Sequence, residues 1–341
     1  MSRLKIGVIG CGSIARLRHL SEYAANKDVE IVAVCDIVEN RVKETAVDYN
    51  AKAFTNYKEL LADESIDAIS VCLPNYLHAP VSIAASNAGK HVLCEKPMAT
   101  SREEAEQMIE AASKNNKKLM IGHNQRFVPA HEKARQLIAN GEIGKIYSFR
   151  TAFGHPGPEG WSIDGRDSWF FNKEEAFIGA MGDLGVHKTD LMRYLLDEEF
   201  AEVAGFVETN AKEDTDIDDN AVCILKTESG IIGTLAASWA YTARSDNSTV
   251  IYGEKAILRL EDDPKYSLIA QYKNGEVVKY ELGAIQSNEE GGQHTSHVID
   301  HFIAAIVNET EVPISGEEGM KSLEVVLAAL ESNQNKTIVR I

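Results

Sequence analysis

The sequence contains little cysteine, and the few cysteines that it has are not arranged for metal binding. The five residues Cys11, Cys35, Cys72, Cys94 and Cys223 include no C-x-x-C pair. Three of them lie in or at the end of apolar strand-like runs, so we expect small buried hydrophobic side chains in a reducing cytoplasm. The sequence therefore gives no reason to expect a zinc site.

Long apolar runs and positive charge are also scarce. No run approaches the length of a membrane span, and the chain begins by entering a strand, so we expect neither a membrane anchor nor a signal peptide. Asp and Glu number 52 against 35 Lys and Arg, which gives a net charge of −17. This charge argues against nucleic acid or an anionic membrane as a partner. A chain of 341 residues should form two domains.

A glycine-rich turn near the N-terminus is the first motif with chemical content. Residues 6–9 are typical of a buried parallel strand, and Gly10, Gly12 and Ala15 follow in the G-x-G-x-x-G/A pattern. Gly10 permits a tight turn, Gly12 lets the backbone approach a pyrophosphate, and Ala15 lets the next helix pack closely. The N-terminus of that helix offers free N–H groups to the phosphates. The residues assigned to this contact are Gly10, Gly12, Ser13, Ile14 and Ala15.

The next strand-like run, residues 31–35, ends at Asp36. A carboxylate there can accept hydrogen bonds from the ribose hydroxyls of adenosine, and it repels a 2′-phosphate. The sequence therefore favours NAD as the cofactor, while Arg41 leaves NADP possible. The alternative is a loop glycine pair and a strand-terminal aspartate in some other α/β fold.

Strands and helices alternate through the first part of the chain. Further strands are expected at residues 53–54, 68–73, 91–94 and 118–122. Such alternation predicts a doubly wound parallel sheet, in which ligands bind beyond the carboxyl ends of the strands. The glycine turn, Asp36, residues 74–78, Lys96 and residues 123–126 should then surround one crevice.

The second part of the chain has a different pattern. Helices are expected at 128–140, 180–196, 297–307 and 316–333, and alternating or β-rich runs fill much of 143–282. We therefore predict an NAD(P)-binding Rossmann domain over residues 1–123. Residues 124–341 should form an α+β domain for substrate binding and oligomerisation, with a largely antiparallel open sheet backed by helices.

Lys96, in Glu95-Lys96-Pro97, stands at the end of a strand where the nicotinamide should lie. It could polarise a substrate hydroxyl or carbonyl; the alternative is a surface lysine.

A second cluster places Asp183, His187 and Asp190 on one helix face. Two carboxylates beside an imidazole would hold its tautomer and raise its basicity, as suits a general base. The alternatives are a metal site, which a single histidine makes less favourable, or an exposed acidic face with a hydrogen-bonded histidine.

A long loop, residues 152–172, is rich in glycine, proline and aromatic residues. Its aromatic and polar side chains suit a sugar ring, and the equally plausible alternative is that the tryptophans anchor the loop or an oligomer contact. The residues in question are His155, Trp161, Asp164, Arg166 and Trp169.

The chain contains three motifs in a specific order: Gly10-x-Gly12-x-x-Ala15, Glu95-Lys96-Pro97 and Asp183-x-x-x-His187. With these motifs it resembles the glucose-fructose oxidoreductase, inositol dehydrogenase and MocA family over almost its whole length. The resemblance implies that Lys96, Asp183 and His187 form a catalytic triad. Lys96 would hydrogen-bond the reacting oxygen, Asp183 would position the substrate, and His187 would take the hydroxyl proton. The glycine-rich run that usually precedes the aspartate is slightly altered here, at residues 178–182.

The resemblance also places several residues around the ligands and implies a homodimer or homotetramer formed through the second sheet. The Lys96–Pro97 bond is expected to be cis. The residues implied near the nicotinamide ribose are Asn75, His78 and Glu95, and those bordering the substrate are Asn124, Gln125 and Arg126. Pro74 and Lys96 are assigned to the cofactor by their places at the carboxyl ends of the strands.

Taken together, these patterns predict a cytoplasmic, NAD-dependent dehydrogenase of a sugar, cyclitol or related polyol, without a metal. Two alternatives stay open. One is a glycosidase that keeps NAD bound and uses transient oxidation. The other is a non-catalytic dinucleotide-binding regulator, although the presence of Lys96 and His187 counts against it.

Overall fold

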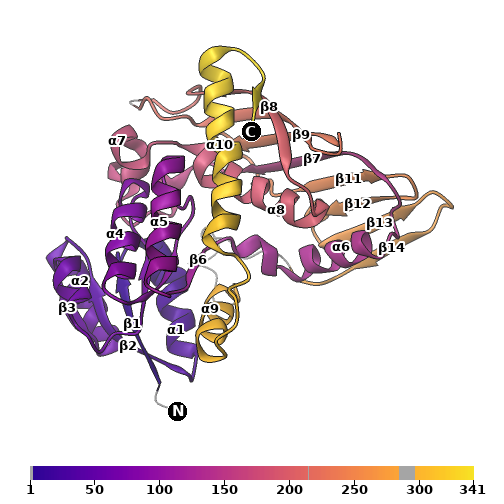
Figure 1. Cartoon of the computed structure of the whole chain (residues 1–341). Coiled ribbons are helices and arrows are strands. Elements are labelled where there is room, and N and C mark those ends of the chain that lie inside the picture. Colours follow the sequence, from indigo (N-terminus) through magenta and orange to yellow (C-terminus); the bar gives the residue numbers. More distant parts are fainter. Residues whose placement is uncertain (1–2, 214, 284–295) are drawn as a thin grey trace.

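The computed structural model describes residues 3–213, 215–283 and 296–341, which form two β-sheets with a long helix between them (Figure 1). The smaller sheet is built from the N-terminal part of the chain and the larger one from the remainder. None of the helices in the described part of the chain has the length and apolar character that crossing a bilayer requires. All five cysteines are buried and free of disulfide bonds.

The first sheet is parallel, with strand order β3-β2-β1-β4-β5-β6. Its strands are β1 Leu4–Ile9, β2 Val29–Cys35, β3 Lys52–Phe54, β4 Ala68–Val71, β5 His91–Cys94 and β6 Leu119–Ile121. The helical segments between them are η1 Ala15–His19, α1 Leu20–Ala25, α2 Glu39–Tyr49, α3 Tyr57–Leu61, α4 Asn75–Asn87 and α5 Arg102–Lys114. The predicted doubly wound sheet is confirmed. Strand order reverses between β1 and β4, and ligands of such sheets bind at that reversal.

The second sheet has nine strands in the order β14-β13-β12-β11-β7-β10-β9-β8-β15. Its pairs are antiparallel except for β7 with β10, so the prediction of a largely antiparallel sheet is confirmed. The strands are β7 Ile146–Gly154, β8 Phe200–Glu208, β9 Asn220–Thr227, β10 Ile232–Ser238, β11 Thr249–Gly253, β12 Ala256–Leu260, β13 Leu268–Tyr272, β14 Val277–Tyr280 and β15 Val339–Arg340. The sequence did not predict β15.

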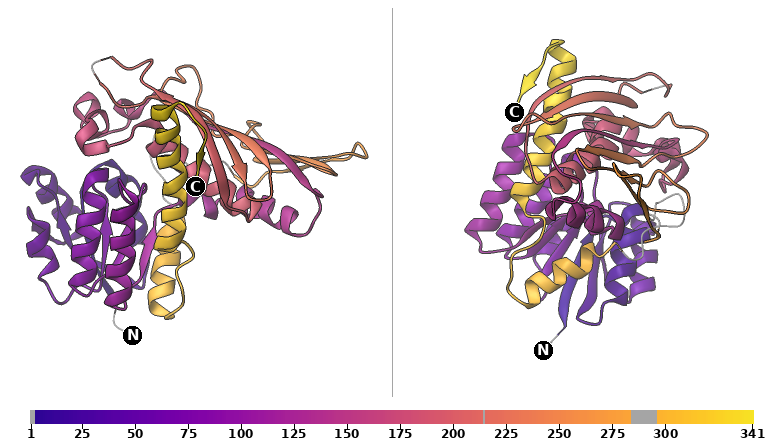
Figure 2. Two further views of the ribbon diagram at one scale, coloured as in Figure 1. Left: turned by 45° about the horizontal axis from the view of Figure 1, so that its top comes forward. Right: turned by 90° about the vertical axis from the view of Figure 1, so that its right-hand side faces the viewer.

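Helices cover one face of this sheet and leave the other open (Figures 1 and 2). The covering helices are α6 Pro129–Ala139, α8 Val186–Leu196 and α10 Gly316–Asn335. The burial pattern of β9 alternates along the strand, as expected for a sheet with one buried and one exposed face.

The C-terminal helices connect the two halves of the molecule. Val298 and Phe302 of α9 Val298–Val307 belong to the hydrophobic core of the first sheet. The long helix α10 Gly316–Asn335 packs against α5 on one side and against β8 and α8 on the other (Figure 1). The last part of the chain therefore contributes to both cores. The domain boundary at residue 123 stays a prediction.

Candidate active site

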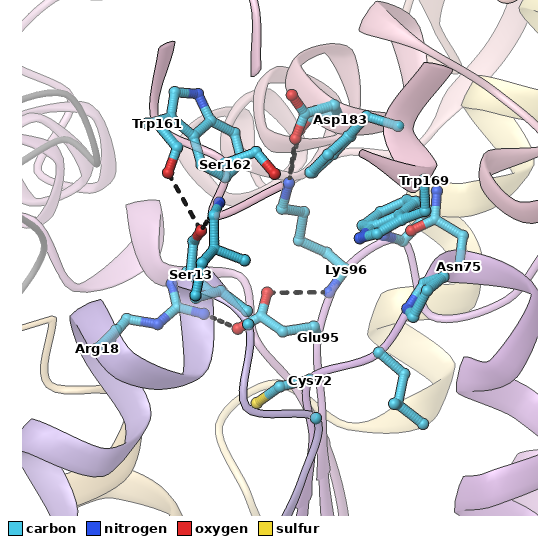
Figure 3. Close-up of a pocket in the computed structure, with 18 of the residues that line it drawn as sticks. Ser13, Arg18, Cys72, Asn75, Glu95, Lys96, Trp161, Ser162, Trp169 and Asp183 are labelled. Carbon is cyan, nitrogen blue, oxygen red and sulfur yellow. Dashed lines mark hydrogen bonds and ion pairs between the residues drawn. The ribbon is translucent and has the colours of Figure 1, made fainter. Parts of the chain in front are cut away.

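A cavity of about 660 Å³ lies between the two sheets and contains most of the predicted site residues (Figure 3). The predicted residues that line it are Gly10, Gly12, Ser13, Ile14, Asp36, Arg41, Pro74, Asn75, His78, Glu95, Lys96, Asn124, Gln125, His155, Trp161, Asp164, Trp169, Asp183 and His187. Four others, Ala15, Arg126, Arg166 and Asp190, do not line it, and Arg166 is exposed on the surface. Ala15 is fully buried behind the turn, as its packing role requires, and Arg126 is turned towards an ion-pair cluster described below.

The glycine turn has the geometry that a pyrophosphate site needs. Gly10 has a φ of +95°, and a Cβ there would lie 2.1 Å from the carbonyl oxygen of Cys72, so only glycine fits. A Cβ on Gly12 would meet nothing within 4 Å, which leaves that side of the backbone open to a ligand. The helical segment η1 begins at Ala15, and the first N–H groups of a helix have no partner within it. These features fit the diphosphate of a dinucleotide.

Asp36 follows β2 and is held in the cavity wall by the backbone. Its carboxylate accepts hydrogen bonds from the N–H of Cys11 (2.9 Å) and from that of Val38 (2.9 Å). The side chain is nearly buried but still lines the cavity. Its orientation is therefore set before any ribose hydroxyl arrives, which lowers the entropic cost of binding.

The segment from Glu95 to Pro97 is anchored by a buried polar network. The Glu95 carboxylate contacts Arg18, the ring of His19 (Nε2, 2.7 Å) and the backbone N–H of Lys96 (3.3 Å), as Figure 3 shows in part. The Lys96–Pro97 peptide is cis, as predicted. Sequence analysis missed Arg18 and His19, because nothing in their local pattern distinguishes them from other residues of an ordinary helix.

His78 lies in the cavity wall, but its ring nitrogens face the protein backbone. Nδ1 is 2.7 Å from the carbonyl oxygen of Pro97, and Nε2 is 2.8 Å from that of Leu73. A neutral imidazole can donate to only one of these two acceptors at a time. This geometry makes His78 a support for the loop that carries Lys96.

Lys96 is held at the cavity by Asp183. Its Nζ donates to the Oδ1 of Asp183 and to the backbone oxygen of the same residue, both at 2.8 Å (Figure 3). The other carboxylate oxygen, Oδ2, accepts a hydrogen bond from the indole of Trp239 at 3.1 Å. Burial favours the neutral acid, but the charges of Lys96 and His155, together with the hydrogen bonds from Lys96 and Trp239, outweigh it and hold the pKa of Asp183 below its usual value. The sequence analysis predicted only that Trp239 belongs to a strand, and it did not predict this contact.

His187 has a different electrostatic environment from the one that the sequence predicts. Burial, followed by the positive charge of Lys96, lowers its pKa well below the usual 6.5, so the imidazole is neutral at pH 7. Its neighbours include the rings of Phe153 (5.7 Å between centroids) and His123 (6.5 Å). The Nδ1 atom is buried and has no hydrogen-bond partner among the described residues. The prediction that two carboxylates raise the basicity of His187 is wrong.

Asp190 is the reason for that error. Asp183 lies in the π-helical turn η6 Met181–Gly185, whereas Asp190 lies in α8, so the α-helical spacing behind the prediction does not hold between them. Asp190 binds both Nε (2.8 Å) and Nη2 (2.6 Å) of Arg126, whose Nη2 also lies 2.9 Å from Glu318 of α10. Arg126 therefore ties α8 to α10. Its predicted contact with the substrate is not supported by this geometry.

In the loop of residues 152–172, the aromatic side chains pack on one another. Trp169 stacks on Phe170 at 3.9 Å, and Trp161 meets the same ring edge-on at 5.2 Å. These contacts agree with the alternative in which the tryptophans anchor the loop. His155 nevertheless lies in the cavity wall, where its proximity helps to lower the pKa of Asp183.

Comparison with known proteins accounts for both halves of the chain. Residues 4–123 match the model described as an oxidoreductase family with an NAD-binding Rossmann fold. Residues 131–259 match the GFO/IDH/MocA C-terminal domain. The chain belongs to the Gfo/Idh/MocA oxidoreductase family. It is therefore an oxidoreductase, and its cofactor is NAD.

Several members of the Gfo/Idh/MocA family are similar over most of their length. Levoglucosan dehydrogenase of Pseudarthrobacter phenanthrenivorans is 31% identical over 271 residues, covering 70% of this chain and 68% of that protein. Myo-inositol 2-dehydrogenase of Thermotoga maritima is 27% identical over 348 residues, covering 99% and 98%. A solved structure of levoglucosan dehydrogenase with NADH and levoglucosan superposes with a TM-score of 0.88 at 25% identity, covering 100% of this chain and 99% of that one.

Proposed function

We propose that this oxidoreductase oxidises a ring hydroxyl of a sugar, cyclitol or related polyol at Lys96, Asp183 and His187. One observation carries the proposal: three features lie in the same cavity. They are an ammonium group that a carboxylate holds in place, a neutral imidazole, and the glycine turn. Similar proteins are named levoglucosan dehydrogenase, myo-inositol 2-dehydrogenase and D-glucoside 3-dehydrogenase, and these names support a substrate of this class.

The geometry favours a separate role for each residue. Lys96 uses two hydrogen bonds on Asp183, and an ammonium group has three N–H donors, so one is left for the substrate oxygen. His187, neutral at pH 7, can accept the hydroxyl proton. Asp183 orients Lys96 and is itself oriented by Trp239. When bound, NAD supplies nicotinamide C4 as the hydride acceptor.

Removing the hydroxyl proton while the hydride leaves avoids both a free alkoxide and a carbocation. The positive charge of Lys96 stabilises the negative charge that develops on the reacting oxygen. Asn124, Gln125 and His155 border the same cavity, and we assign them to the remaining substrate hydroxyls. Trp161 would present an apolar edge to the ring.

The first experiment is an absorbance measurement at the NADH band. Purified protein is mixed with NAD and each member of a panel of sugars and cyclitols. We expect a sustained rise with at least one compound, which would also identify the substrate class. NAD binding without any rise would contradict the proposal, and a parallel assay of glycoside cleavage would then distinguish a redox-neutral glycosidase from a regulator.

We also propose that the chain forms a homodimer or homotetramer in the cytoplasm. Phe206, Val222, Ile224 and Ile232 are more than half exposed on the open face of the second sheet. They lie on the neighbouring strands β8, β9 and β10, and exposed apolar side chains gathered in this way are typical of a protein interface. Light scattering after gel filtration is expected to show an oligomer that Ile224→Lys weakens, and a monomeric wild-type protein would refute this assignment.

A further inference from the structure

The loop that follows β7 reaches across the cavity and contacts the glycine turn. Its short helical segments are η3 Pro158–Gly160, η4 Gly165–Asp167 and η5 Trp169–Phe171. The hydroxyl of Ser13 donates to the backbone oxygen of Trp161 (3.1 Å; Figure 3) and accepts from the N–H of Ile163 (2.8 Å). The phosphate-binding turn of the first domain is therefore joined directly to a loop of the second.

The same loop makes a second contact at the adenosine end of the cavity. Asp164 forms an ion pair with the guanidinium of Arg41, which belongs to α2. Another nitrogen of that guanidinium, Nη1, lies 3.7 Å from the carboxylate of Asp36. The Arg41 side chain is 16% exposed and that of Asp164 is 38% exposed, so solvent screens the pair only in part. One cation is thus shared between two carboxylates, one from each domain.

This arrangement bears on which dinucleotide can bind. In Rossmann domains, an acid after the second strand accepts the ribose 2′-hydroxyl of NAD, and a nearby arginine can accommodate the 2′-phosphate of NADP. By sequence, Asp36 and Arg41 could serve either cofactor. We propose that Asp164 is a specificity-determining residue: it occupies and neutralises Arg41, and so selects NAD over NADP.

The electrostatics support this choice. With Asp164 in place, two carboxylates face one guanidinium, so the cluster repels a dianionic phosphate. Without Asp164, the positive charge of Arg41 and the negative charge of Asp36 cancel. The guanidinium can then form charge-assisted hydrogen bonds to phosphate oxygens. NAD has a hydroxyl at the same position and needs only the Asp36 oxygen as an acceptor. The loop residue therefore acts mainly against NADP and little on NAD.

The test measures nucleotide binding directly, in the absence of any substrate. NAD and NADP are each titrated into the protein, and their dissociation constants are measured by calorimetry or tryptophan fluorescence. Asp164→Asn keeps the size of the side chain and removes its charge. We expect it to lower the ratio of the NADP Kd to the NAD Kd by roughly fivefold to tenfold, mainly through tighter NADP binding.

Asp167→Asn is the matched control, because it removes the same charge from the same loop without touching the Arg41 pair. For this variant, the ratio of the NADP Kd to the NAD Kd is expected to stay within about twofold of the wild-type value. The double variant Arg41→Ala/Asp164→Asn is expected to lose the gain in NADP binding, since the cation that would hold the phosphate is gone. The proposal is overturned if Asp164→Asn folds normally with an unchanged ratio. It is also overturned if Asp167→Asn shifts the ratio equally or the double variant keeps the gain.

Discussion

Replacing Lys96 with methionine, or His187 with alanine, is expected to lower kcat by roughly a hundredfold to ten-thousandfold, the usual contribution of a positioned proton-transfer or oxyanion-stabilising group. Lys96→Met keeps the aliphatic stem in the cavity wall but removes the third N–H and the charge that would face the substrate oxygen. His187→Ala removes the group that accepts the proton. The measurement is steady-state NADH formation with the compound that the panel identifies.

Nucleotide affinity separates a catalytic role from a structural one. The NAD Kd should change by no more than about threefold in either variant, because the glycine turn and Asp36 supply most of the cofactor contacts. Lys52→Ala serves as a control, since this lysine is 68% exposed, pairs with Asp63 and does not line the cavity. If Lys96→Met and His187→Ala both retain full activity, the assignment of the site is wrong.

The free energy of unfolding is expected to fall steeply as the pH is lowered from 7 to 5. His123 and His131 are buried, and burial lowers their pKa from 6.5 to about 4 and about 3. Below pH 6.5 the unfolded chain binds protons that the folded chain excludes, so the folded state loses stability as the pH falls. Each such histidine contributes about 1.4 kcal/mol per pH unit until its folded pKa is reached. These two residues alone should give a slope approaching about 2.7 kcal/mol per pH unit.

Urea unfolding followed by circular dichroism at pH 8, 7, 6 and 5 would measure this slope. His131→Gln keeps a donor for the carbonyl oxygen of Gln125, which lies 2.7 Å from Nδ1 in the wild type, and cannot titrate. We expect this variant to lose about half of the slope that the two histidines contribute. Its comparison with the wild type at pH 8, where histidine is neutral in both states, isolates the packing cost of the substitution. If the free energy of unfolding changed equally with pH in both proteins, the pKa of His131 would be the same in the folded and unfolded states, which would contradict this prediction.

The sequence alone was sufficient for the features that depend on local spacing. Gly10, Gly12 and Ala15 follow one another within a single turn and helix start, so their order reports the geometry of that turn. The period of the apolar residues distinguished the buried parallel strands from the half-exposed antiparallel ones, which predicted both sheets. β15 was missed because two residues are too few to show a period.

Only the tertiary structure decided which side chains meet across long stretches of chain. Asp183 lies in a π-helical turn and pairs with Lys96, whereas Asp190 lies in the α-helix that follows and pairs with Arg126. Asp164 was a candidate for a sugar ring and instead meets Arg41, far away in the sequence. The pKa of His187 depends on burial and on Lys96, neither of which local spacing records. The spacing of residues in the sequence determines on which side of a helix or strand each side chain lies. The distances between side chains of different elements, and the electrostatic interactions that depend on those distances, are determined only when the elements pack together.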